Sequence, residues 1–207
     1  MKDPTWRALQ RSCRRCHDAC PSLIYSGSEG DARPLLHEGG NLKTDVLFVL
    51  AAANHDDTFN PDKGHVTICE GTDPTGTFLN ALVRDVLQRS PEEVLFMNSV
   101  LCLPAKKASG YPIPAALRDQ CLPHLKATID AIDPPVVAPM GGVALKALSR
   151  IAKHDIKNIT EEAGVPVSWY GRTLFPLVSA SALGQANYSA EKQRADWRAL
   201  SHLLEDL

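Results

Sequence analysis

An apolar run followed at once by polar side chains is the first place in this chain where chemistry could occur. Residues 46 to 57 read VLFVLAAANHDD, so that Asn54, His55, Asp56 and Asp57 follow the run without a spacer. In open α/β sheets ligands bind just beyond the carboxyl ends of the strands, where carboxylates and a histidine could position or activate a water molecule. Asn and Asp are also common turn and cap residues, so a solvated loop remains the alternative interpretation.

Cysteines are the second set of residues that could do chemistry. Cys13 and Cys16 form a CxxC pair, and Cys102 and Cys121 lie much farther along the chain. Four thiolates could hold a metal ion or a cluster, although this spacing is not that of a zinc ribbon. Cysteine also behaves as a small hydrophobic residue, and on spacing alone Cys102 could simply end a buried strand.

Strand-like and helix-like segments alternate along the chain and would position these residues. Val46 to Leu50 are typical of a buried parallel strand, and the alternation favours a parallel sheet with helices on both faces. We therefore expect an α/β fold, a three-layer α/β/α arrangement around a central, mostly parallel four-stranded sheet. Strands are expected at 45–50, 94–101 and 135–140 and in two short segments, 165–171 and 172–181, and helices at 6–19, 72–88, 114–132, 141–152 and 190–207.

Composition limits the classes of protein to which the chain could belong. Its 207 residues predict a single domain, 1–207, and its net charge of −2 gives no global signal for nucleic acid, so DNA contacts would need a local patch. The longest apolar stretch is far shorter than the roughly 20 residues that span a bilayer. The amino-terminal residues have no apolar core typical of a signal peptide. We expect a cytoplasmic monomer without a membrane partner.

The order of these segments resembles the uracil-DNA glycosylase superfamily, most closely its iron–sulfur-containing family 4. CRRC matches the family's CxxC, VLAAANHDD at 49 to 57 falls on GEAPGxxED, and MNSVLC at 97 to 102 falls on TNVVKC. A helix with a further cysteine and a strand that enters a glycine-started helix follow, and FPLVSASAL at 175 to 183 falls on FPTYHPAAL. The resemblance covers most of the chain in order, although the identity within each motif is low.

The resemblance implies a cofactor and a base-binding site. It implies that Cys13, Cys16, Cys102 and Cys121 hold a structural 4Fe–4S cluster, for which four cysteine thiolates are the usual ligands. It places Asn98 where the family reads the Watson–Crick edge of the base, with Leu50, Ala51 and Ser179 around the base. A role for Asn98 in satisfying local backbone groups is the alternative.

This sequence departs from the family where the chemistry occurs. Leu50 aligns with the acidic residue that activates water, Ser179 with the histidine that supports the leaving base, and no aromatic residue stands at 66–70 to stack on the base. Because the replacements are mostly smaller, we expect a pocket widened for a bulkier modified base. Asp56 or Asp57 would replace the missing acid, with His55 and Asn54 as weaker catalytic candidates.

DNA binding would use a wedge residue and phosphate contacts. The resemblance places Leu183 as the wedge, although a leucine in the hydrophobic core is the alternative. Basic residues flank the expected cluster ligands and could form one face or a scattered solvated surface. They are Arg14, Arg15, Lys106, Lys107 and Arg118.

Together these residues predict a monofunctional DNA glycosylase, a hydrolase of N-glycosyl bonds acting on uracil or a bulkier modified pyrimidine. The alternative is a catalytically inactive DNA- or modified-base-binding module that keeps the fold and the cluster. A metal-bound structural protein unrelated to DNA is a third possibility.

Overall fold

A five-stranded sheet runs through the middle of the computed structural model, with strand order β5-β2-β6-β8-β7. The structure describes residues 41–52, 74–101, 113 and 115–207, and the backbone of three two-residue strands. The first four strands of the order are mutually parallel, and only β7 runs antiparallel to its neighbour β8. Their bounds are β2 Val46–Ala52, β5 Leu95–Val100, β6 Val136–Pro139, β7 Val167–Trp169 and β8 Arg172–Leu174.

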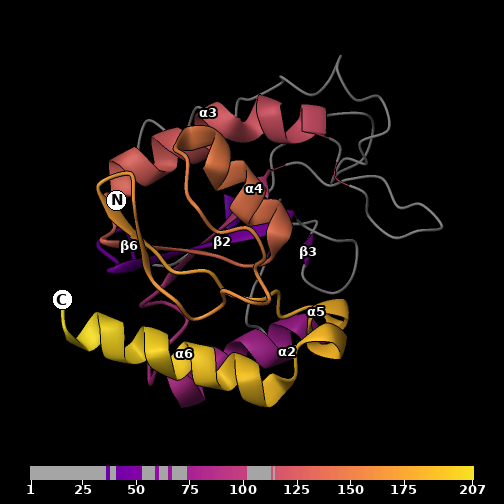
Figure 1. Ribbon diagram of the computed structural model, residues 1–207, viewed down its shortest axis with the longest axis vertical. Coiled ribbons are helices and arrows are strands. Elements are labelled where there is room, and N and C mark those ends of the chain that lie inside the picture. Colours follow the sequence, from indigo (N-terminus) through magenta and orange to yellow (C-terminus); the bar gives the residue numbers. More distant parts are fainter. Residues whose placement is uncertain are drawn as a thin grey trace.

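Helices cover both faces of this sheet, as Figure 1 shows. On one face lie α2 (Pro74–Ala81), its π-helical continuation η1 (Leu82–Val86) and the closing helix α6 (Ala190–Glu205). On the other face lie α3 (Ala115–Ile132) and α4 (Gly142–Ile151). The predicted three-layer α/β/α fold is therefore confirmed, with five strands in the sheet rather than four.

Strand β2 is buried on both faces because its side chains alternate between the two cores. Val46 and Phe48 enter the core beneath α2 and α6, whereas Leu47 and Val49 enter the core beneath α3 and α4. All four side chains are fully buried. This is the burial that an unbroken apolar run predicts for a central parallel strand.

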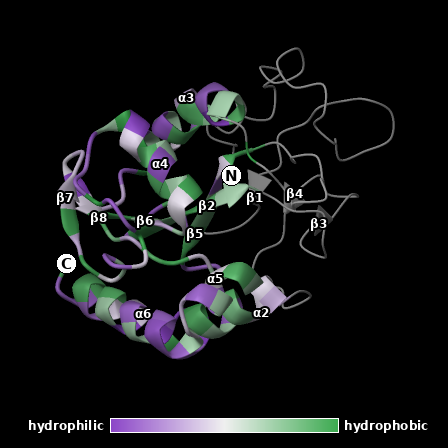
Figure 2. Ribbon diagram, turned by 45° about the vertical axis from the view of Figure 1, so that its right-hand side comes forward, coloured by the Kyte–Doolittle hydropathy of each residue, from purple (hydrophilic) through white to green (hydrophobic). Residues whose placement is uncertain are grey.

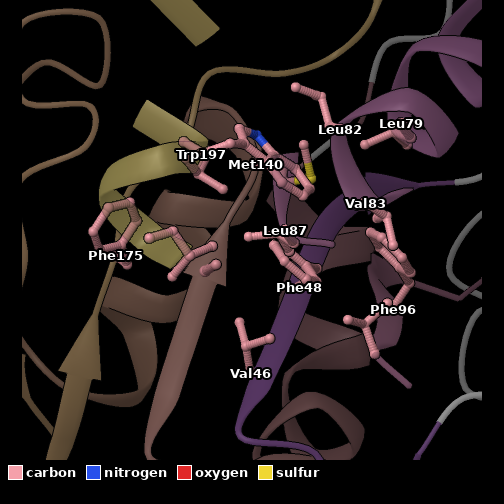
Figure 3. Close-up of a cluster of buried hydrophobic side chains, with 14 of the residues drawn as sticks. Val46, Phe48, Leu79, Leu82, Val83, Leu87, Phe96, Met140, Phe175 and Trp197 are labelled. Atoms are coloured by element: carbon pink, nitrogen blue, oxygen red, sulfur yellow. The ribbon is translucent and has the colours of Figure 1, made fainter. Parts of the chain in front are cut away.

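Aromatic stacking joins α6 to the sheet at Phe48. The ring of Phe48 stacks on Phe96 of β5 at a centroid distance of 4.9 Å and on Trp197 of α6 at 5.0 Å (Figure 3). Hydrophobic and hydrophilic residues alternate along α6, as expected for a helix with one face on the core (Figure 2). Phe48 thus connects three elements that lie far apart in the sequence.

The chain reverses direction between β7 and β8 in a tight hairpin. Tyr170 and Gly171 both have positive φ, at 49° and 72°, which is the geometry of a type I′ turn. β8 is shorter than the predicted strand, because Pro176 lacks the N–H group that would continue the ladder. On the β6 side, hydrogen bonds from Phe175 to Val137 and from Leu177 to Pro139, both 2.9 Å, lead to an isolated bridge between Met140 and Leu177.

Several predictions concern residues that the structure does not describe, among them the helix at 6–19 and the single domain over 1–207. A second, small sheet joins β1 (Leu36–His37), β4 (His65–Val66) and β3 (Phe59–Asn60) in that order. Within the described ranges, no helix is long and apolar enough to cross a membrane.

Truncation of Phe48 tests its role in the core. We expect Phe48→Ala to lower the free energy of unfolding by about 3 to 5 kcal/mol, because it leaves a cavity between two aromatic rings. Leu207→Ala is the control, since Leu207 is 65% exposed and its loss should change stability by less than about 0.5 kcal/mol. Urea denaturation of both variants measures the difference, and equal losses would contradict this assignment.

Candidate functional site

The carboxyl ends of the parallel strands meet at one edge of the sheet. Leu50 of β2 lies beside Asn98 of β5, and Met140 lies beside Leu177. In a parallel pair, partners in register point to the same face, so Leu50 and Asn98 are neighbours on the face covered by α2 and α6. The structure therefore brings together two residues that the sequence placed at the base.

Asn98 is a buried amide at this edge. Its side chain belongs to a residue that is only 3% exposed, and in the part of the chain that the structure describes no group hydrogen-bonds to it. The next residue differs, because the Ser99 hydroxyl donates to the Ala51 carbonyl oxygen at 2.7 Å. A side-chain amide can make up to four hydrogen bonds, as donor and as acceptor. Asn98 is therefore suited to bind a polar ligand.

The end of β2 supplies apolar groups to the same edge. Leu50 is half-buried against the core that contains Phe48, and Ala51 and Ala52 are also half-buried. None of these side chains can accept or donate a proton. Asn54, His55, Asp56 and Asp57 follow within 53–58, outside the described residues, so their catalytic roles remain predictions.

Ser179 belongs to a hydrogen-bonded turn that follows the sheet. Its hydroxyl oxygen accepts from the Ser181 backbone N–H at 3.3 Å and lies 3.1 Å from the Ser181 hydroxyl oxygen. Ser181 in turn caps helix α5 (Ala182–Asn187) by accepting from the Gly184 N–H at 3.2 Å. Ser179 therefore helps to build the turn. Its predicted contact with the base is not tested by this geometry.

Two glycines permit close approach around Ser179. Gly141 has a φ of 90°, donates its N–H to the Leu177 carbonyl at 2.8 Å, and would carry a Cβ 3.2 Å from the Ser179 Cβ. A Cβ on Gly184 would lie only 1.9 Å from the Ser179 carbonyl oxygen. Ser99, Ser181 and Gly184 were not predicted as site residues, because their roles depend on contacts across elements.

Leu183 lies on the surface of α5 and is 74% exposed. The interpretation of Leu183 as a core leucine is therefore wrong. An exposed apolar side chain on a short helix beside the candidate site is consistent with a wedge, although the wedge role itself remains a prediction.

Cys121 is the one predicted cluster ligand within the described ranges. It lies on α3, is 2% exposed, and packs in a small core with Val100, Leu101 and Leu117. Leu101 directly precedes Cys102, so the chain leads from this core to a second predicted ligand. Cys13, Cys16 and Cys102 themselves lie outside the described residues. Among the residues that are described, no three or more His, Cys, Asp or Glu side chains gather as a metal site.

The predicted phosphate contacts mostly fall outside the described ranges as well. Arg14, Arg15, Lys106 and Lys107 lie there. Arg118 is half-buried on α3, three residues before Cys121.

Substitution of Gly184 tests the packing of α5 against the Ser179 turn. We expect Gly184→Ala to destabilise the protein by about 1 to 3 kcal/mol, because the new methyl group collides with backbone rather than with a flexible side chain. Thermal unfolding measures the change.

Gly142→Ala is the matched control, since a Cβ at Gly142 meets nothing within 4 Å and Gly142 opens α4. It should leave stability unchanged or raise it by up to about 1 kcal/mol. A Gly184→Ala variant as stable as the control would show that the turn is not tightly packed.

A protein-family model matches most of the chain. The family model described as "Uracil DNA glycosylase superfamily" matches residues 34–203, a range that begins just before β1 and ends within α6. No curated protein sequence matches the chain.

Proposed function

The chain belongs to the uracil DNA glycosylase superfamily, and from that premise we propose that it flips a noncanonical base from DNA and hydrolyses its N-glycosidic bond. Membership supports a DNA glycosylase-like function and DNA as the partner. The observation that carries the proposal is Asn98, a buried amide with no hydrogen-bond partner among the described residues, at the carboxyl edge beside Leu50. A flipped base is read by hydrogen bonds to its Watson–Crick edge, which a side-chain amide can both donate and accept.

The proposed reaction is a direct hydrolysis. A water oxygen bonds to the sugar C1′ atom, the N-glycosidic bond breaks, and its electron pair leaves with the base. The amide of Asn98 would stabilise the charge that develops on the departing base, as a hydrogen-bond donor aimed at that charge does. Because Leu50 cannot position water, we assign that role to Asp56 or Asp57, one of which would also accept the proton.

We propose that the preferred base is a pyrimidine bulkier than uracil. Leu50, Ala51 and Ala52 line the end of β2 with small or apolar groups, and Ser179 is smaller than the histidine in the corresponding family motif. A pocket must match a flipped base closely, so smaller side chains favour a larger base. Uracil itself remains the less favoured substrate.

A catalytically inactive module is the second candidate, and a specific observation favours it. Leu50 has no ionisable group, and the Ser179 hydroxyl is engaged with Ser181. If neither Asp56 nor Asp57 replaces the acid, the protein would bind DNA or a modified base without cleaving it.

An excision assay separates the two candidates. Duplexes that contain uracil, hydroxymethylcytosine or glucosylated cytosine are incubated with the protein, and abasic product is measured. We expect excision, with the larger bases preferred, and we expect Asn98→Ala to lower kcat/KM by about 100-fold or more because it removes a charge-stabilising donor.

Asp56→Asn and Asp57→Asn, made separately, identify which of the two carboxylates positions the attacking water. One of them should lose most of the activity while the other serves as its control. DNA binding without abasic product from any duplex would support the inactive module, and unchanged rates in both variants would rule out the substitute acid.

We further propose a structural 4Fe–4S cluster held by Cys13, Cys16, Cys102 and Cys121, as in family 4. Two things support this: the resemblance, and the burial of Cys121 beside Leu101, which directly precedes Cys102. A bound cluster would join the amino-terminal segment to α3 and to the segment after β5. Thiolate ligands are the chemistry that such a cluster requires.

Metal analysis tests the cluster independently of activity. Protein prepared without oxygen should be brown and contain about four iron atoms per chain. Cys121→Ser should lose the colour and most of the iron, whereas Cys69→Ser, at a cysteine outside the proposed set, should keep both. Colourless protein that contains zinc would contradict the proposal.

A further inference from the structure

Helix α5, the start of α6 and the start of α2 gather at one end of the molecule in both ribbon views (Figures 1 and 2). A hydrogen bond joins the end of α5 to the first turn of α6, because the Gln193 side-chain amide donates to the Tyr188 carbonyl oxygen at 3.1 Å. The Ser189 hydroxyl caps α6 by accepting from the Lys192 N–H at 3.3 Å. The exposed Leu183 is therefore held in a defined position relative to the first turn of α6.

Two cations near this corner lie over aromatic rings. The Lys192 Nζ is 5.6 Å from the ring centroid of Tyr188, and the Arg194 Cζ is 5.4 Å from that of Phe78 in α2. A cation over a ring face is attracted by the ring, and its N–H groups that point away from the ring are not bound by it. These donors therefore remain available to an anion outside the protein.

Neither cation uses the carboxylate that its own helix offers. Asp196 lies four residues after Lys192 and Glu191 lies three residues before Arg194, and both spacings allow ion pairs on a helix. Within the described ranges, neither Lys192 nor Arg194 makes an ion pair. By contrast, Arg89 binds Asp45 through two hydrogen bonds at the other end of the sheet.

Asp196 points inward instead. Its Oδ1 accepts from the Tyr188 hydroxyl at 3.3 Å and lies 2.7 Å from the position that a Cβ on Gly164 would take. Among the described residues its buried Oδ2 has no hydrogen-bond partner, and burial raises the pKa of the carboxyl group. The Asp196 carboxylate therefore does not pair with Lys192 or Arg194 on the surface of α6.

The exposed charge of this corner is therefore positive. Lys192 and Arg198 are exposed on α6 and Arg194 is half-buried against Phe78, whereas Glu191 is the exposed carboxylate of its first turns. This local excess opposes the net charge of −2 for the whole chain. Clustered cations that keep free donors are the usual contacts of DNA phosphates.

We propose that Lys192 and Arg194 form a phosphate-binding edge that grips the DNA backbone beside the nucleotide displaced at Leu183. The inference rests on the proposed function and adds a surface to it. The guanidinium of Arg194 would bind a phosphate through two N–H groups, and the ammonium of Lys192 would bind the next phosphate as a point charge. These contacts carry no base preference, so they would strengthen binding to any duplex sequence.

The salt dependence of DNA binding tests the phosphate-binding edge. Lys192→Gln, Arg194→Gln and the double variant are titrated with a uracil-containing duplex and with an unmodified duplex at several salt concentrations. The double variant should reduce the slope of log K against log salt by about 2, and each single variant by about 1. At 0.1 M salt each lost contact should weaken binding by on the order of tenfold, equally for both duplexes.

Two exposed cations on other elements serve as matched controls. Arg84→Gln and Lys153→Gln each remove one exposed positive charge. Arg84 lies in η1, the continuation of α2, and Lys153 follows the end of α4, whereas Lys192 and Arg194 lie at the start of α6. Both control variants should keep the wild-type slope. Arg194→Lys should restore most of the slope lost in Arg194→Gln, because the charge rather than the packing on Phe78 binds the phosphate.

The outcomes distinguish this inference from the proposed function. If the wild-type protein binds no duplex, both fail together. If it binds and the variants keep its slope, or if the controls lose as much as the variants, the edge is overturned while the glycosylase proposal stands. A lower melting temperature of Arg194→Gln with an unchanged slope would likewise assign Arg194 to packing alone.

Discussion

The burial of β2 on both faces is the constraint on which the rest of the structure depends. Its side chains alternate between two cores, and Phe48 stacks between a neighbouring strand and α6. A strand held in this way has one register and one direction, since a shift by one residue would exchange the two faces. The positions of Leu50 and of the residues after it follow from that register, as does the pairing with Asn98.

Polar groups at the carboxyl edge divide into two kinds. The hydroxyls of Ser99, Ser179 and Ser181 are all used within the protein, where they shape the end of β2 and the turn into α5. Asn98 makes no such bond among the described residues. A site for a small polar ligand needs both kinds, because satisfied groups keep the walls rigid while a group without a partner in the protein can bind the ligand.

Leu50 and Ser179 stand at the positions that the resemblance assigns to the acid and the histidine of the family motifs. The Leu50 side chain has no ionisable group, so it cannot activate water. Under the proposed function, that role falls to the segment after Ala52, which contains Asp56 and Asp57. The phosphate-binding edge proposed above would likewise be local, at the start of α6, while the whole chain has a net charge of −2. Local charge is sufficient for phosphate binding, because salt screens interactions beyond about 10 Å.

Local patterns were enough to predict much of the fold. The apolar run of β2, the helix from Ala115 to Ile132 and the glycines before α4 all follow from short-range periodicity and backbone preferences, which the sequence contains in full. All five strand segments were predicted, but the expected sheet had only four strands, because a sequence pattern does not show whether a short segment such as β7 pairs at the edge of the sheet. The order of the motifs also predicted which residues meet at the carboxyl edge, and the pairing of Leu50 with Asn98 places two of them side by side there.

Contacts between distant segments were decided only by the tertiary structure. The exposure of Leu183, the inward turn of Asp196 and the placement of Lys192 and Arg194 on aromatic rings all depend on how α5 and α6 pack. No periodicity encodes them, because a side chain's partner on another element is set by the fold and not by its neighbours in sequence. The sequence therefore determined which chemical groups stand near the carboxyl edge of the sheet, and packing decided which of their side chains are exposed to a ligand.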